Sequence, residues 1–153
     1  MANTKQRATD VDMRAAQAGS AYGNEVVHYG KLSAAAPDTC GILRALRIPG
    51  GTRIDELIII NDDFDSTTVP TITCKVGYTP VNSTLGPAAD DDYFFAASST
   101  LLQTAAKNTS TSKPIVFDYD VYIDVEVQVI AKSFAATAPE LHVIARGELK
   151  GTK

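Results

Sequence analysis

The chain has 153 residues and a mass of 16.3 kDa, with 44% hydrophobic and 21% charged residues, which predicts one domain with a core of its own. No apolar run reaches the roughly 18 residues of a membrane-spanning helix, and residues 1–12 lack the apolar segment of a secretory signal, so we expect synthesis in a cytoplasm and no membrane partner. The net charge of −4 is uneven, because seven Lys/Arg face four Asp/Glu up to Arg53 and seven face fourteen from Ile54 onward. A body of that sign repels phosphate, which disfavours nucleic acid as a partner.

The first forty residues are predicted to form an extended N-terminal arm. They mix Ala, Gln, Gly, Ser, Thr and charged residues with few large apolar side chains, and they show no sustained apolar stripe. Within the arm, the β-branched and aromatic residues of 25–29 predict a short strand that Gly30 closes. The sequence therefore predicts an arm over 1–40 and a folded domain over 41–153.

Three strands are predicted in the first half of this domain. Apolar residues predict strands over 42–48 and 53–60, and Pro49-Gly50-Gly51 between them predicts a tight turn. This pair forms either a hairpin or a corner at which the chain changes sheets. A third strand is predicted over 71–78, ending before Pro80.

The second half contains one predicted helix and three further strands. Three Asp residues at 90–92 precede an apolar run, which favours the positive end of a helix dipole and predicts a helix near 91–105. A short strand follows Pro114, and the last strand is predicted over 140–149. Between them, strict alternation predicts a half-buried strand whose core face carries Val121, Ile123, Val125, Val127 and Val129. About eight short strands indicate an all-β fold, an antiparallel, jelly-roll-like β-sandwich with one short inserted helix.

Acidic loops provide the best candidates for a metal site. Asp62, Asp63 and Asp65 stand in one loop, and Ca²⁺ prefers several oxygen ligands from loops. The spacing does not fit an EF-hand, because neither the required Gly nor the closing Glu is in place. We expect solvated turn carboxylates here and no metal or cofactor.

No catalytic constellation is recognisable in the sequence. His28 and His142 lie inside predicted strands, and neither Cys40 nor Cys74 stands beside a predicted base. Two cysteines so far apart also do not define a disulfide scaffold or a zinc knuckle. We therefore expect a binding or structural protein and not an enzyme.

The order of apolar blocks and turns resembles a known class of protein. Over 42–149 the chain resembles small virion structural proteins of tailed bacteriophages, in particular capsid decoration (cement or head stabilisation) proteins. The blocks that carry this resemblance are IPGGTRI at 48–54, LIIINDDFD at 57–65, TITCKVGY at 71–78 and DDDYFFAA at 90–97.

The resemblance implies a β-sandwich that assembles as a small homo-oligomer, a dimer or a trimer, on the outer surface of a capsid and stabilises it by bridging major capsid subunits. An arm that orders on binding adds contact area, so we expect the arm to lie along the capsid or a sister subunit. Its expected contact residues are Arg7, Arg14, Tyr22, Val26, Val27 and Tyr29. The simpler alternative is that 1–20 is a tail and 24–30 an edge strand.

Two other functions remain open from the sequence. A head completion or tail component of a phage virion would share the β-rich body but occur in far fewer copies. A carbohydrate-binding module is the second alternative, although the chain has no Trp and sugar platforms favour flat aromatic faces. An exposed Tyr on one sheet face, such as Tyr122, would support the carbohydrate-binding alternative.

Overall fold

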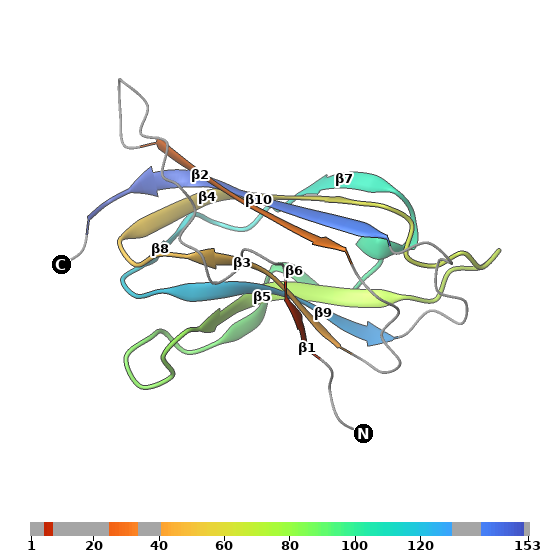
Figure 1. Cartoon of the computed structure of the whole chain (residues 1–153), viewed down its shortest axis with the longest axis horizontal. Coiled ribbons are helices and arrows are strands. Elements are labelled where there is room, and N and C mark those ends of the chain that lie inside the picture. The colour runs from red at the N-terminus through yellow and green to blue at the C-terminus, as the bar shows by residue number, and fades with distance from the viewer. Residues whose placement is uncertain (1–4, 8–24, 34–40, 130–138, 152–153) are drawn as a thin grey trace.

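The computed structural model is a sandwich of two β-sheets, seen as two layers in Figure 1. It describes residues 5–7, 25–33, 41–129 and 139–151. Within these residues there are ten strands and one 3-10 turn: β1 (Lys5–Arg7), β2 (Glu25–Ser33), β3 (Ile42–Ile48), β4 (Thr52–Asn61), β5 (Thr73–Pro80), β6 (Asp90–Ser99), η1 (Leu101–Gln103), β7 (Ala106–Thr109), β8 (Ile115–Phe117), β9 (Val121–Val129) and β10 (Glu140–Leu149). The expected all-β sandwich is confirmed.

The strand order is that of a jelly roll with two additional strands. One sheet, sheet A, has the order β1-β3-β9-β5-β6, and the other, sheet B, has the order β2-β10-β4-β7 with β8 also paired to β4. The first long strand lies beside the last in sheet B, and the second lies beside the next to last in sheet A, as in a jelly roll. Every pairing is antiparallel except that of β1 with β3.

The Pro49-Gly50-Gly51 turn is a corner at which the chain changes sheets. It joins β3 in sheet A to β4 in sheet B. Gly51 has a φ of 80°, a left-handed conformation that glycine adopts without a steric penalty. The corner is held by a hydrogen bond from the Gly51 N–H to the Phe117 carbonyl, 2.7 Å, and by one from the Gly50 N–H to Asp120, 2.8 Å.

The core lies between the sheets and is built from the alternating residues of facing strands. On β9, the predicted core residues Val121, Ile123, Val125 and Val127 are at most 1% exposed, which confirms the predicted alternation for these four. The side chain of Val129 lies outside the described residues. The opposite layer contributes Leu57 and Ile59 of β4 and Leu141 and Val143 of β10, all fully buried.

The helix predicted near 91–105 is wrong. Residues 90–99 form β6, an edge strand that pairs antiparallel with β5, for example Val76 with Phe95. Aromatic residues at 93–95 favour a strand, and Phe94 is packed into the core. The acidic residues stand on an exposed strand instead of a helix N-terminus, and Asp91 pairs with Lys75 at 2.6 Å. Only the 3-10 turn Leu101–Gln103 is helical in this region.

Part of the segment expected to be an arm is a strand of the sandwich. The strand predicted over 25–29 extends over Glu25–Ser33, and it pairs with β10 along its whole length. Its residues alternate strictly between exposed and buried, beginning with exposed Glu25. At Gly30 the strand crosses close over β3, because an added Cβ would stand 2.0 Å from the carbonyl oxygen of Ala45. The sandwich therefore begins before residue 41.

Candidate interaction surfaces

The outward row of β2 presents apolar side chains to solvent. Val27 and Tyr29 are each 47% exposed and point away from the core, whereas Val26 is 1% exposed and belongs to the core. Arg7 lies in β1, and both Arg14 and Tyr22 lie outside the described residues. Of the six expected contact residues, the structure therefore brings Val27 and Tyr29 together on one surface.

The apolar row continues across sheet B. Tyr29 stands opposite Ile144 of β10, and Ile144 stands opposite Ile58 of β4, so the three side chains share the outer face of the sheet, although Ile58 is only 2% exposed. One register step along, Ile60 on β4 is 36% exposed. An apolar centre of this kind with charged residues around it is the usual anatomy of a protein interface.

A chain of polar contacts borders this apolar row. The hydroxyl of Tyr29 lies 2.7 Å from Nδ1 of His142, and Nε2 of His142 lies 3.4 Å from Glu140. Glu140 also pairs with Lys31 at 2.6 Å, and this hydrogen bond raises the pKa of Lys31 and lowers that of Glu140. The contacts hold Tyr29 and Lys31 in defined positions on the outer face of β2.

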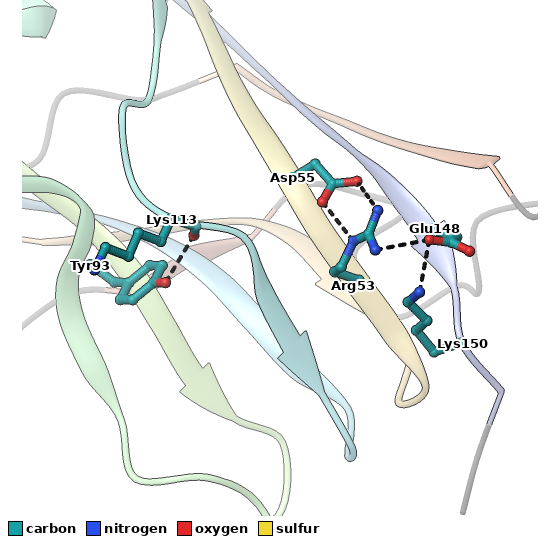
Figure 2. Close-up of polar contacts among 6 residues, drawn as sticks. All are labelled: Arg53, Asp55, Tyr93, Lys113, Glu148 and Lys150. Carbon is teal, nitrogen blue, oxygen red and sulfur yellow. Dashed lines mark hydrogen bonds and ion pairs between the residues drawn. The ribbon is translucent and has the colours of Figure 1, made fainter.

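The other end of the same face is a network of ion pairs (Figure 2). Arg53 donates to Asp55 at 2.6 Å and pairs with Glu148 at 3.0 Å, and Lys150 also contacts Glu148 at 3.0 Å. The hydrogen bond to Asp55 raises the pKa of Arg53. Glu25 lines the same shallow depression, and no cation pairs with it within the described residues. The cross-strand partner of Glu25 on β10 is Glu148, a second acid.

The outer face of sheet A carries a buried ion pair. Arg44 donates two hydrogen bonds to Asp124, at 2.8 and 2.9 Å, and the hydroxyl of Thr79 donates to the same carboxylate at 2.7 Å. The guanidinium stacks 3.9 Å above the ring of Tyr122, which is 9% exposed. Tyr122 is therefore not an exposed platform for a sugar.

Exposed apolar residues also meet at one end of the sandwich. Leu85, Val116 and Tyr119 are 57%, 50% and 49% exposed and line a groove above Phe117. The groove lies between the β5–β6 connection and the chain around β8. Loops at the end of a rigid sandwich are common positions for binding residues.

The carboxylates of the acidic loop at 62–65 accept hydrogen bonds from nearby groups of the protein. Asp65 is 1% exposed and accepts hydrogen bonds from the Thr67 hydroxyl at 2.6 Å and from the N–H groups of Thr71 and Ile72 at 2.6 and 3.0 Å. Burial alone raises the pKa of this carboxyl, but the hydrogen bonds outweigh it and lower the pKa to about 2.

Asp62 and Asp63 also accept hydrogen bonds from backbone N–H groups. Asp63 accepts the N–H of Asp65 at 2.8 Å, and Asp62 accepts the N–H of Glu140 at 2.9 Å. Within the described residues, no three His, Cys, Asp or Glu side chains are grouped to hold a metal ion. Asp63 and Asp65 thus order the connection from β4 to β5, and Asp62 links its start to β10.

Of the remaining candidate groups for chemistry, Cys40 lies outside the described residues, and Cys74 and His28 are packed into the protein. Cys74 is fully buried, and burial raises the pKa of its thiol to about 12, which keeps it protonated and unreactive. His28 is also fully buried, and burial lowers the pKa of its imidazole. The part of the chain that the structure describes contains no helix with the length and apolar character to cross a bilayer.

Several residues of the outer face of sheet B were not predicted from the sequence. Lys31, Glu140 and His142 come together only because β2 pairs with β10 in this register. The sequence places Ile60 in a predicted strand but does not indicate which face of the sheet it occupies. The period-two pattern of 25–33 is the signal that could have identified the exposed row of β2.

No family model matches the chain, and no curated protein sequence matches it. Two solved structures share its fold. A chain from the capsid of Ralstonia phage GP4 superposes with a TM-score of 0.75 and 20% sequence identity, over 98% of this chain and 100% of that chain. A chain from the capsid asymmetric unit of cyanophage Pam1 superposes with a TM-score of 0.62 and 23% identity, over 90% of this chain and 94% of that chain. The chain is therefore similar in fold, over nearly its whole length, to chains of two bacteriophage capsids.

Proposed function

We propose that the chain is a bacteriophage virion structural protein that binds the outer surface of the capsid and stabilises it by bridging major capsid subunits. The carrying observation is the fold similarity to a chain of the Ralstonia phage GP4 capsid, which covers 98% of one chain and all of the other. A match over two complete chains reflects the whole jelly roll and not one shared motif. In this proposal the protein is synthesised in the host cytoplasm and acts on the virion without enzymatic activity.

The surface of the sandwich supports a role in assembly. Val27, Tyr29 and Ile60 expose apolar area on sheet B, and Leu85, Val116 and Tyr119 expose more at the loop end. Burying such patches against capsid subunits supplies the hydrophobic contribution that holds an assembly together. A rigid block with two apolar surfaces can contact two neighbouring subunits at once, which is what bridging requires.

The arm is part of the proposal. Residues 2–22 precede β2 and include β1 (Lys5–Arg7), which pairs with β3 in sheet A. The proposal has the rest of this segment lie along the capsid or a sister subunit and add contact area. A chain lacking residues 2–22 loses the three-residue β1, should keep the far-UV spectrum of the remaining sandwich and should lose attachment to capsids. Retained attachment would refute the role of the arm.

Binding can be tested by adding the protein back to capsids. Capsids are prepared from a phage in which this gene is deleted and are mixed with the purified chain. Gradient separation measures how much of the chain binds, and heating measures the temperature at which the capsids break. We expect saturable binding and a higher disruption temperature of the capsid. The control variant is Lys150→Ala, which changes the charged end of sheet B away from the apolar residues and should bind capsids like the original chain. Absence of binding to the capsid, or binding with an unchanged disruption temperature, would overturn the proposal.

A further inference from the structure

We propose that β2 pairs antiparallel with β2 of a second copy of this chain, centred on His28, so that the two sandwiches join edge to edge as a two-fold dimer. This inference goes beyond the proposed function and does not depend on it. The dimer would turn the two copies of sheet B into one continuous sheet.

Among the described strands, β2 is an edge strand with one side unpaired. In sheet B it is the terminal strand, paired with β10 on one side and with no strand of the described residues on the other. It runs for nine residues, Glu25–Ser33, without a proline. A long open edge presents unpaired N–H and C=O groups and is a template for another strand.

The exposed row of β2 is complementary to itself in one register. The outward side chains are, in order, an acid, two apolar residues and a base: Glu25, Val27, Tyr29 and Lys31. With the two-fold axis at His28, Glu25 faces Lys31 of the second copy, and Val27 faces Tyr29 of the second copy. Both pairs occur twice because the interface is two-fold.

Other registers lose this match. A shift by two residues sets Lys31 opposite Val27 in one direction or Glu25 opposite Tyr29 in the other, so one charge faces an apolar residue and both charge pairs are lost. A shift by one residue places the exposed row against the buried row, which the pleat forbids. The complementary register is therefore specified by the alternation of exposed and buried residues as well as by the charge pairs.

Two features of the single chain are compensated by the pairing. Glu25 makes no ion pair within the described residues and stands opposite Glu148, so Lys31 of the second copy supplies the opposite charge. Val27 and Tyr29, each 47% exposed, stand beside their counterparts on the outer face and cover part of one another's surface. His28, at the centre of the register, is fully buried in its own sandwich and makes no contact across the axis.

The first test is the oligomeric state of the full chain and of three charge variants. Sedimentation equilibrium should give twice the 16.3 kDa mass of the chain. Glu25→Lys and Lys31→Glu should each weaken the dimer about tenfold, because each replaces two attractive cross-strand pairs by repulsive ones. The double variant Glu25→Lys/Lys31→Glu restores both pairs with reversed polarity, although it also places a second carboxylate beside Glu140, and should dimerise more tightly than either single variant.

A cysteine cross-link tests the register itself. In a Cys40→Ser background, Val27→Cys/Tyr29→Cys places thiols on facing residues, whose Cα atoms stand about 4.5–5.5 Å apart in an antiparallel pair, within disulfide range. The matched control Glu25→Cys/Tyr29→Cys is two residues out of register and beyond that range. Mild oxidation should give a covalent dimer with the first pair only.

The results separate this inference from the proposed function. A monomer at 100 μM, a double charge variant that stays dissociated, or equal cross-linking of the control would each overturn the β2 pairing. Capsid binding is measured independently by add-back. A chain that dimerises through β2 and does not bind capsids contradicts only the proposed function, and one that binds capsids as a monomer contradicts only the pairing.

Discussion

Replacing Asp65 by Asn should remove a pH-dependent part of the stability of the sandwich. The carboxylate is buried and accepts hydrogen bonds from Thr67, Thr71 and Ile72, so it fastens the connection between β4 and β5. Its pKa is lowered from 3.8 to about 2. Each pKa unit corresponds to about 1.4 kcal/mol, so the ionised form stabilises the fold by roughly 2 kcal/mol relative to the unfolded chain.

The sign follows from the direction of the shift. Because the folded pKa lies below that of the unfolded chain, the unfolded chain takes up the proton first as the pH falls. The contribution is complete well above pH 3.8 and is lost as the pH falls toward 2. Asp65→Asn has no charge to lose, so its stability should depend less on pH in this window.

The assay is urea unfolding followed by far-UV circular dichroism from pH 7 to pH 2. We expect the original chain to exceed Asp65→Asn by about 2 kcal/mol at pH 7 and the gap to narrow toward zero near pH 2. Asp92→Asn, on the exposed part of β6, is the control and should follow the original chain. A gap that stays constant across the range would refute the reasoning. Millimolar Ca²⁺ should leave the unfolding midpoint unchanged, because the carboxylate oxygens of Asp65 are already occupied.

Three further predictions concern buried polar groups and close backbone contact. Asp124→Ala removes the carboxylate that neutralises the buried Arg44 guanidinium and should cost about 3–5 kcal/mol, whereas Arg44→Met/Asp124→Leu should cost much less than the sum of its single changes; additive losses in a double-mutant cycle would contradict this. Burial lowers the pKa of His28 below 6.5, so stability should decline as the pH falls below that value, and His28→Gln should remove this decline; identical pH profiles would show that His28 is not responsible. Gly30→Ala inserts a Cβ against the Ala45 carbonyl and should lower the free energy of unfolding by about 1–3 kcal/mol, measured by urea unfolding; an unchanged midpoint would contradict the close crossing of β2 over β3.

The sequence predicts the fold well where one face of a strand is apolar. The bounds predicted for 42–48, 121–129 and 140–149 agree with β3, β9 and β10, because alternation and flanking turn residues are local signals. The prediction from the sequence is wrong at 90–99. There three acidic residues suggest the start of a helix, but pairing with β5 determines the structure. It also missed β7, because a short polar strand is defined by its pairing with β4 and not by its own pattern.

The surfaces were predictable only in part. Val27 and Tyr29 stood out as apolar residues beside Gly30, yet Val26 carries the same signal and is in the core, because only the pairing partner determines which face is buried. The contacts among Lys31, Glu140 and His142 depend on the register between strands more than a hundred residues apart in the chain. Such contacts need the tertiary structure.

The most direct measurement of the central claim is the copy number of this chain in purified virions. Quantitative mass spectrometry of the phage that encodes it compares the molar amount of this chain with that of the major capsid protein. A protein that covers the capsid lattice and bridges its subunits should be present at a number comparable to the capsid subunit. A handful of copies would contradict that role and favour a head completion or tail component, and absence from the virion would contradict a structural role altogether.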